Sequence, residues 1–256
     1  MVKVLVAGFN GAMGQKVVDL VHRTPGFELV AGYDPAAPTN ESKILGDNIP
    51  IFRSLSEIQT DAEIWIDFTI PTAAFSNTKF AIEHQIAPII GTTGMGEDAQ
   101  QQLVDLSLKK HCGGIIAPNF GLSAVLLMKF AAEASQYFAD SDVIEMHHAD
   151  KKDAPSGTAL QTAKMIAANR QNESVQINHD ESLPHVLGGE YQGVKIHSVR
   201  LPGYIAHEEV LFGGQGEALT IRQDSFDRES FMGGVKVAMQ KVLNLDHLVV
   251  GLDKIL

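Results

Sequence analysis

Cysteine is nearly absent from this chain, because the 256 residues contain a single one, Cys112. One thiol cannot form an internal disulfide, and no cysteine spacing matches a structural metal site, so we expect no metal and a reducing compartment. The chain also lacks an uninterrupted apolar run of about 18 residues, the length that a membrane span needs. Residues 1–8 form too short an apolar run for a signal peptide. We therefore expect a cytoplasmic protein with no membrane partner.

Basic residues are in deficit. The chain has 20 Lys and Arg against 31 Asp and Glu, which gives a formal net charge of −11. This charge repels a nucleic-acid backbone, so a nucleic-acid partner is not expected. A hydrophobic share of 45% and a charged share of 20% are ordinary for a folded protein, and the length allows one large domain or two modest ones.

Strands and helices alternate in the first half of the chain. Short apolar runs predict strands at 2–7, 28–33, 64–68, 86–90 and 114–117, and helical spacing predicts helices at 12–22, 73–83 and 98–110. Strands that are separated by helices favour a parallel sheet with helical crossovers. The fold class is therefore α/β, with a Rossmann-type domain over residues 1–118.

The pattern changes after Asn119. A helix is predicted over 123–138, and closely spaced strands follow at 194–200, 208–212 and 217–223, with a glycine-rich hairpin signal at 213–216. This indicates a second, α+β domain with a mixed sheet over residues 119–226. A helix predicted at 227–240 returns residues 227–256 to the first domain. The polar segment 169–182 is interpreted as a variable surface segment.

Glycines recur at intervals of three between the first predicted strand and helix, at Gly8, Gly11 and Gly14. Glycine lets the backbone turn tightly and approach a pyrophosphate, while the helix start aims N–H groups at the anion. A plain tight turn shows the same spacing, but the strand-to-helix context favours a dinucleotide site. The residues predicted to bind the cofactor here are Gly8, Phe9, Asn10, Gly11, Ala12 and Met13.

Asp34 ends the second predicted strand, about 20 residues after Gly14, where a carboxylate accepts from the adenosine ribose. The alternative is a turn residue before Pro35. No cation stands beside Asp34 to neutralise a 2′-phosphate, and Lys43 is the nearest one. The sequence therefore favours NADH over NADPH.

Two later segments fall where a doubly wound sheet places its ligand loops, at the carboxyl ends of strands. They are Gly91-Thr92-Thr93-Gly94 and Ala117-Pro118-Asn119-Phe120. Either segment also fits a plain strand end. Asp67-Phe68-Thr69 occupies an equivalent strand end, and a buried turn is an equal interpretation there.

The run from residue 145 to residue 160 concentrates histidines and lysines before Ser156, Gly157 and Thr158, which open a predicted helix. The start of a helix favours a carboxylate or a phosphate. His147, His148 and Lys151 beside it suit acid catalysis on an acidic substrate. An exposed charged loop is the plain alternative. A metal site formed by His147, His148, Asp150 and Asp153 is disfavoured, because adjacent strand residues point to opposite faces.

With these motifs in view, the sequence resembles the dihydrodipicolinate reductase family, also called 4-hydroxy-tetrahydrodipicolinate reductase, of bacterial lysine and diaminopimelate biosynthesis. The resemblance spans nearly the whole chain. It rests on residues 8–14, 67–69, 91–94, 117–120, 145–160 and 198–200. Residues 145–160 are highly specific to that family, whereas the glycine turn alone is not.

The resemblance implies an enzyme that uses NADH or NADPH to reduce 4-hydroxy-tetrahydrodipicolinate, a small cyclic imine dicarboxylate, to tetrahydrodipicolinate. It also implies a substrate-binding second domain whose sheet assembles a homotetramer. By the same resemblance, His147 and Lys151 form the proton-donating pair and His148 contacts substrate. Gly157 and Thr158, with Ser156 of the same turn, hold a substrate carboxylate. The nicotinamide side is implied to comprise Gly91, Thr92, Thr93, Ala117, Pro118, Asn119 and Phe120.

One departure from the family concerns the glycine turn. Many members carry an arginine there, whereas this chain has Ala12 and Gln15. Extra neutralisation of the cofactor phosphates is therefore not expected.

Two rival functions explain less of the sequence. Another two-domain nicotinamide enzyme, such as an aspartate or homoserine dehydrogenase, would explain the first half but not the run at 145–160. A non-catalytic sensor that binds NADH and regulates a partner would carry a DNA-binding or docking module. The acidic composition, with no basic recognition helix, argues against such a sensor.

Overall fold

The computed structural model describes residues 1–37, 44–46, 48–172 and 180–256. Lys43 and part of the predicted surface segment 169–182 lie outside the described residues. The chain divides into two compact units. Unit 1 comprises Met1–Phe120 and Phe231–Leu256, and unit 2 comprises Gly121–Ser230. Within the described ranges, no helix combines the length and apolar character needed to cross a membrane.

Unit 1 contains a seven-stranded sheet in the order β12-β6-β5-β4-β1-β2-β3, and every neighbouring pair is parallel. The strands are β1 (Val2–Ala7), β2 (Phe27–Tyr33), β3 (Ile51–Phe52), β4 (Ile64–Asp67), β5 (Ala87–Ile90), β6 (Gly114–Ile116) and β12 (Leu248–Val250). The chain runs from β1 to one edge and then returns to β4 on the other side of β1. In doubly wound sheets, ligands bind at the carboxyl ends of the strands where the order reverses, which here are β1 and β4.

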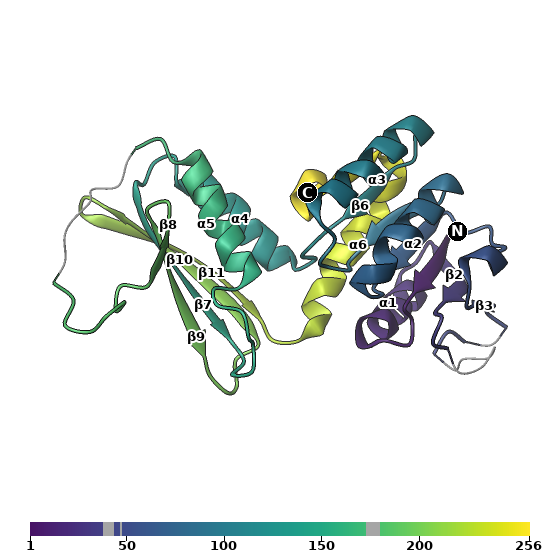
Figure 1. The fold of residues 1–256 in the computed structure, drawn as a ribbon, viewed down its shortest axis with the longest axis horizontal. Helices are drawn as coiled ribbons and strands as arrows, with labels where there is room; N and C mark the ends of the chain where they lie inside the picture. The colour runs from purple at the N-terminus through teal and green to yellow at the C-terminus, as the bar shows by residue number, and fades with distance from the viewer. Residues whose placement is uncertain (38–43, 47, 173–179) are drawn as a thin grey trace. The chain divides into compact units, whose positions relative to one another are not determined.

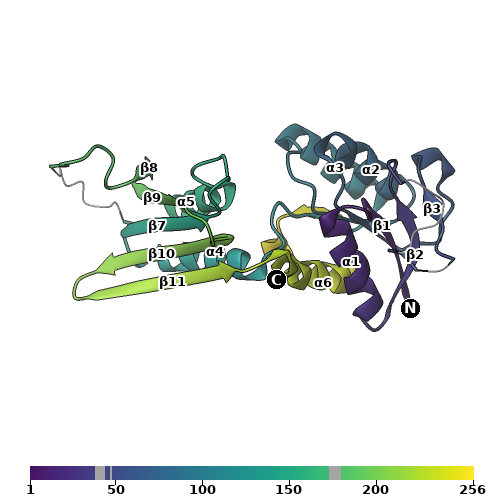
Figure 2. The ribbon, with the colours of Figure 1, turned by 90° about the horizontal axis from the view of Figure 1, so that it is seen from below.

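Helices cover both faces of the unit 1 sheet. Figure 2 shows α2 (Pro71–Glu83) and α3 (Glu97–Lys110) on one face, with α1 (Ala12–Arg23) and α6 (Met232–Lys241) on the other. All residues of β4 and β5 are consequently buried, as expected for a parallel sheet between two helical layers. The helix predicted over 227–240 begins only at Met232, after a 3-10 turn at Arg228–Phe231.

Unit 2 contains a five-stranded sheet in the order β11-β10-β7-β9-β8. The strands are β7 (Asp140–His147), β8 (Gly189–Tyr191), β9 (Val194–Arg200), β10 (Ala206–Gly214) and β11 (Glu217–Ser225). The β7–β9 pair is parallel and the other pairs are antiparallel, so the sheet is mixed. Helices α4 (Leu122–Ala134) and α5 (Gly157–Asn169) pack on one face of it (Figure 1). The predicted fold class, a Rossmann-type sheet plus an α+β unit with a mixed sheet, is confirmed.

The turn between β1 and α1 depends on close backbone packing. Gly8 has φ +75°, and its N–H donates to the carbonyl of Tyr33 at 2.8 Å. A Cβ atom on Gly14 would lie 2.0 Å from the carbonyl oxygen of Gly8. Gly14 therefore lets α1 start directly against the end of β1, which is the packing role of a glycine in a dinucleotide-binding turn.

We expect Gly14→Ala to destabilise the protein, because the added methyl group meets backbone atoms that cannot move aside. The free energy of unfolding, measured by urea denaturation, should fall by about 1 to 3 kcal/mol. Gly96→Ala is the control, since Gly96 is the N-cap of α3 and a Cβ atom there meets nothing within 4 Å. Equal stability of the two variants would contradict this account of the turn.

Candidate active site

The glycine turn of unit 1 offers backbone rather than side chains to a ligand. Gly11 is the N-cap of α1 and provides no capping side chain, so the N–H groups of the first helical turn keep their capacity to bind an anion. Gln15 donates to the carbonyl of Asn10 at 2.8 Å and closes the turn. The Phe9 side chain is fully buried beside Gly32. Of the predicted cofactor residues here, Phe9 therefore presents only its backbone.

The structure gives Asp34 a turn contact. Its Oδ1 accepts from the N–H of Ala36 at 2.9 Å, which is the turn alternative considered for this residue. The residue remains partly exposed at the end of β2, next to the glycine turn through the Gly8–Tyr33 hydrogen bond. A ribose contact through the other carboxylate oxygen stays a prediction.

Asp67 is fully buried at the end of β4 and organises two of the predicted ligand loops. Its carboxylate accepts from the Thr69 N–H at 2.9 Å, from Asn77 Nδ2 at 2.8 Å and from Thr92 Oγ1 at 3.2 Å. The hydroxyl of Thr69 and the indole of Trp65 also donate to it. These bonds tie the ends of β4 and β5 to α2, so the buried-turn interpretation of Asp67 is the one that the geometry favours.

The Phe68 ring, from the loop after β4, lies against both loops that were implied to line the nicotinamide side. The rings of Phe68 and Phe120 lie 5.9 Å apart, and a Cβ atom on Gly91 would fall 2.1 Å from the Phe68 ring. Thr92, Ala117 and Phe120 are buried, whereas Thr93 and Pro118 are exposed and Gly91 and Asn119 are partly exposed. For all seven of these residues, buried or exposed, contact with a cofactor stays a prediction.

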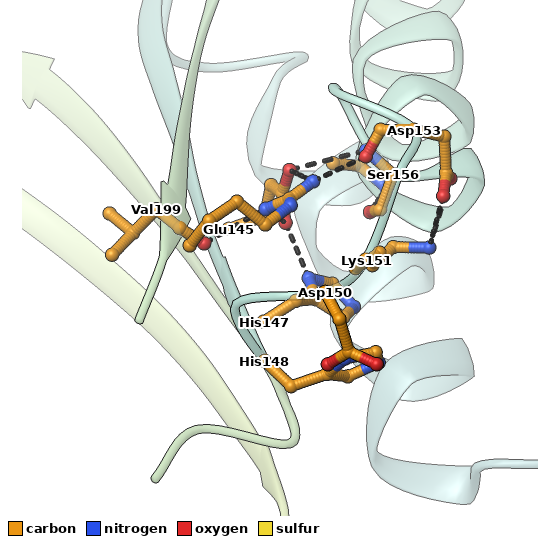
Figure 3. Close-up of polar contacts among 10 residues, drawn as sticks. Glu145, His147, His148, Asp150, Lys151, Asp153, Ser156 and Val199 are labelled. Carbon is orange, nitrogen blue, oxygen red and sulfur yellow. Dashed lines mark hydrogen bonds and ion pairs between the residues drawn. The ribbon is translucent and has the colours of Figure 1, made fainter. Parts of the chain in front are cut away.

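Glu145 on β7 is the centre of the unit 2 cluster (Figure 3). Its side chain is fully buried and forms a bidentate ion pair with Arg200 of β9, at 2.8 and 2.9 Å. It also accepts from His147 Nδ1 at 2.5 Å and from the Ser156 N–H at 3.2 Å. Burial alone would raise the pKa of Glu145, but hydrogen bonds from His147 and Arg200 lower it to about 2.

The Glu145 carboxylate fixes the tautomer of His147. An ionised carboxylate only accepts hydrogen bonds, so Nδ1 of His147 must carry the shared proton. The other ring nitrogen, Nε2, has no hydrogen-bond partner among the residues that the structure describes. The side chain is 13% exposed, which leaves Nε2 available to a ligand.

The loop after β7 carries two further charged pairs. His148 Nδ1 lies 2.6 Å from Asp150, and Lys151 Nζ lies 2.8 and 2.9 Å from the two carboxylate oxygens of Asp153 (Figure 3). These hydrogen bonds lower the pKa of both aspartates. In this part of the chain Lys151 is therefore bound to Asp153 and makes no hydrogen bond to His147.

The residues of the metal alternative do not gather at one point. His147 pairs with Glu145, while His148 pairs with Asp150. Across the described residues, no group of three or more His, Cys, Asp and Glu side chains is placed to hold a metal ion.

The predicted anion site at the start of α5 lies beside this cluster. Ser156 is the N-cap, and its buried Oγ accepts from the Ala159 N–H at 3.2 Å. Gly157 is exposed, with nothing within 4 Å of a Cβ position, and Thr158 is partly exposed. The hydroxyl of Ser156 thus caps the helix, and of the three residues predicted to hold a carboxylate, Gly157 and Thr158 are the two that are exposed or partly exposed.

Two charged residues of the site were not among the predicted ones. Glu145 had a usable signal, because residues two apart on a strand share a face, which puts Glu145 beside His147. Arg200 lies in the motif at 198–200, but residue spacing gave no signal for its role, because it reaches Glu145 only through the pairing of β7 with β9. Arg200 also donates to the carbonyl of Asp153 at 2.6 Å, so it holds the loop as well as the carboxylate.

A Rossmann-type sheet with a glycine turn, and a second unit with an imidazole beside a helix start, are the features expected of a nicotinamide-dependent oxidoreductase. The comparisons with known proteins agree. The family models "Dihydrodipicolinate reductase, N-terminus" and "Dihydrodipicolinate reductase, C-terminus" match residues 2–120 and 123–256. The chain belongs to the dihydrodipicolinate reductase family, as the sequence predicted.

Individual relatives cover the whole chain. A 4-hydroxy-tetrahydrodipicolinate reductase of Lactobacillus helveticus is 62% identical, over 99% of this chain and 98% of the relative. A solved dipicolinate-bound dihydrodipicolinate reductase from Paenisporosarcina sp. TG-14 has a TM-score of 0.90 and 40% identity, with 100% of both chains covered. An amine dehydrogenase from Mycobacterium smegmatis, with a TM-score of 0.68, 12% identity and 100% and 96% of the two chains covered, shares the fold alone.

We expect Glu145→Gln to lower the free energy of unfolding by about 2 to 3 kcal/mol at neutral pH, since it removes the charge that pairs with Arg200. The folded protein lowers the pKa of Glu145 from 4.5 to about 2. The stabilisation is therefore present above pH 4.5 and is lost as the pH falls toward 2. Urea denaturation of wild type and variant at several pH values measures the difference.

Asp150→Asn is the control for this prediction, because Asp150 also binds a histidine but its side chain is 91% exposed. Its effect should stay within about 0.5 kcal/mol. A Glu145→Gln protein as stable as this control at neutral pH would show that the buried ion pair does not stabilise unit 2.

Proposed function

We propose that this reductase uses His147 and Lys151 to supply the proton of its reaction, His148 to contact the substrate, and the start of α5 to hold a substrate carboxylate. The family reaction is the NAD(P)H-dependent reduction of 4-hydroxy-tetrahydrodipicolinate to tetrahydrodipicolinate in lysine and diaminopimelate biosynthesis. The observation that carries the proposal is the alignment of His147 by Glu145 beside the N-terminus of α5.

The reaction adds one hydride and one proton to the substrate, whose hydroxyl group leaves as water. When bound, the reduced nicotinamide supplies the hydride. The protein then has to provide an acid near the ring and counter-charge for two carboxylates. Both requirements fall on unit 2 in this proposal.

His147 and Lys151 fit the acid role in different ways. With Nδ1 held by Glu145, a protonated His147 presents its second proton at Nε2. Lys151 Nζ carries three protons, so the two contacts with Asp153 leave one for the substrate. In this proposal Glu145 orients His147 and Asp153 orients Lys151, and the two proton donors make no hydrogen bond to each other.

The start of α5 fits the carboxylate. Exposed Gly157 and partly exposed Thr158 present the first turn of a 13-residue helix, where the positive end of the dipole favours an anion. The relative from Paenisporosarcina sp. TG-14 was solved with dipicolinate, a ring with two carboxylates. The same charge pattern suits the substrate proposed here.

We expect His147→Ala combined with Lys151→Ala to lower kcat by about 10²- to 10⁴-fold, because both proton donors are lost. NADH oxidation with freshly generated 4-hydroxy-tetrahydrodipicolinate measures turnover, and calorimetry should find nucleotide affinity within about two-fold of wild type, since the glycine turn is untouched. Lys152→Ala, which removes the adjacent exposed lysine, is the matched control and should keep its activity. Near-normal turnover of the double variant would remove this pair from the mechanism.

The residues of unit 1 fit a dinucleotide. Gly8 and Gly14 leave backbone space that a Cβ atom would fill, and the first turn of α1 lacks a side-chain cap. Gly8–Met13 would hold the pyrophosphate and Asp34 the ribose. We propose a preference for NADH, because a 2′-phosphate would meet the Asp34 carboxylate with Pro35 and Ala36 in place of a cation.

We expect kcat/KM to favour NADH by about ten-fold, a modest factor because Asp34 is partly exposed and its charge is screened. Asp34→Ser with Pro35→Arg should reverse the preference. Asp105→Ser, which removes an exposed carboxylate of α3, should leave the ratio unchanged. A strong preference of the wild-type enzyme for NADPH would refute the role of Asp34. It would indicate that a more distant cation, such as Lys43, binds the 2′-phosphate.

A homotetramer is the assembly that we propose. The observation that favours this assembly is that α4 and α5 cover only one face of the unit 2 sheet (Figure 1). By strand alternation, Ile144, Val199 and Leu211 lie on the other face. These partly exposed apolar side chains share the uncovered face with the ion pairs His197–Asp142 and Arg222–Glu209, and a face of this mixed kind suits contact with another copy. The cytoplasm is the proposed compartment, because it supplies reduced nicotinamide nucleotides.

A further inference from the structure

Unit 2 buries a second carboxylate, Glu208 on β10, whose side chain none of the steps above uses. Glu208 is 2% exposed and lies directly opposite Glu145 in the β10–β7 register. Gln223 of β11 lies opposite it on the other side. All three side chains share the face of the sheet that α4 and α5 cover. Two glutamates therefore sit side by side beneath the start of α5.

The contacts of Glu208 connect it to the first turn of α5. Its Oε1 is hydrogen-bonded to the hydroxyl of Thr162, which is fully buried. The same hydroxyl lies 3.1 Å from the carbonyl oxygen of Thr158. A hydroxyl has one proton, so Thr162 can donate to Glu208 or to Thr158 but not to both. Both contacts are hydrogen bonds only if Glu208 itself donates to Thr162.

The charges around Glu208 oppose its ionisation. Glu145 faces it from β7 with its own negative charge, which Arg200 and His147 already pair. Gln223 of β11 and Thr162 of α5 are uncharged. The charged side chains of the covering helices, Lys129, Glu133 and Lys164, are exposed. Burial, with a contribution from Glu145, raises the pKa of Glu208 to about 7, against the opposing hydrogen bond of Thr162.

We propose that Glu208 is a positioning residue, held as a neutral carboxylic acid that donates to Thr162, so that Thr162 donates to the Thr158 carbonyl and fixes the first turn of α5. The effect on substrate binding rests on the proposed carboxylate site at Gly157 and Thr158. Ionisation of Glu208 takes the Thr162 proton away from Thr158 and adds a negative charge beneath that site. Carboxylate binding then weakens as Glu208 loses its proton.

The protonation of Glu208 can be measured without any ligand. In protein with ¹³C-labelled glutamate carboxyls, the NMR resonance that disappears in Glu208→Gln, but not in Glu133→Gln, belongs to Glu208. We expect this resonance at the position of a carboxylic acid at pH 6 and a titration well above that of the exposed glutamates. A resonance at the carboxylate position at pH 6 would overturn the proposal.

Kinetics tests the link to the substrate. Gln keeps a donor for Thr162 and carries no charge at any pH, so Glu208→Gln should keep the wild-type KM at pH 6. Between pH 6 and 9 the wild-type KM should rise about five-fold more than that of Glu208→Gln, as expected for one charge at a partly screened distance. The kcat of the two proteins should stay alike at each pH. Glu133→Gln, which removes an exposed carboxylate of α4, should follow wild type.

A third variant separates this proposal from the proposed function. Thr158→Val, which removes a hydroxyl from the proposed site, should raise KM by about ten-fold or more. If it does so and Glu208→Gln still shows the wild-type dependence of KM on pH, the role of Glu208 is refuted and the carboxylate site stands. If Thr158→Val leaves KM unchanged, the carboxylate site is wrong and the link to binding falls with it, while the NMR titration still decides whether Glu208 is neutral.

Discussion

Glu145 places a negative charge in the interior of unit 2, where an unpaired carboxylate would be strongly unfavourable. Its four hydrogen bonds come from β7, β9 and the N-cap of α5, so one side chain joins three elements of the site. The bond to His147 selects which ring nitrogen is free, and the ion pair holds Arg200 where it supports the loop at Asp153. The positions of the residues in the proposed acid and anion sites therefore depend on this buried charge.

Unit 1 uses a buried carboxylate as well, but with neutral partners. Asp67 accepts from side chains of β4, α2 and the loop after β5, and from the backbone and hydroxyl of Thr69 just after β4. Among the residues that the structure describes, no Lys, Arg or His side chain is a hydrogen-bond partner of Asp67. Hydrogen bonds alone thus compensate its loss of water. The result is a rigid edge at the carboxyl ends of β4 and β5, where the sheet order reverses and a cofactor is expected. In both units, a buried acid therefore fixes the loops at which we propose that a ligand binds.

Local patterns were enough for the parts of the fold that are locally determined. The glycine turn and the longer apolar strands follow from residue type and spacing. Strands β3, β8 and β12 were not predicted, because two or three residues are too few for a periodic pattern; the equally short β6 was found only from the apolar run at 114–117. The helix predicted over 123–138 ends at Ala134, because Ser135 Oγ bonds back to the Ala132 carbonyl and the next residues form a turn. In the site, His147 and the start of α5 were predictable, but Arg200 was not, since 55 residues separate it from Glu145.

The central claim, that Glu145 sets the tautomer of His147, is tested most directly by ¹⁵N NMR of histidine-labelled protein. His147→Asn identifies the resonances of His147. We expect Nδ1 to stay protonated at every pH at which the protein is folded, with only Nε2 gaining and losing a proton. A neutral His147 protonated on Nε2, with Nδ1 bare, would show that the Glu145 carboxylate does not hold the imidazole and would contradict the account.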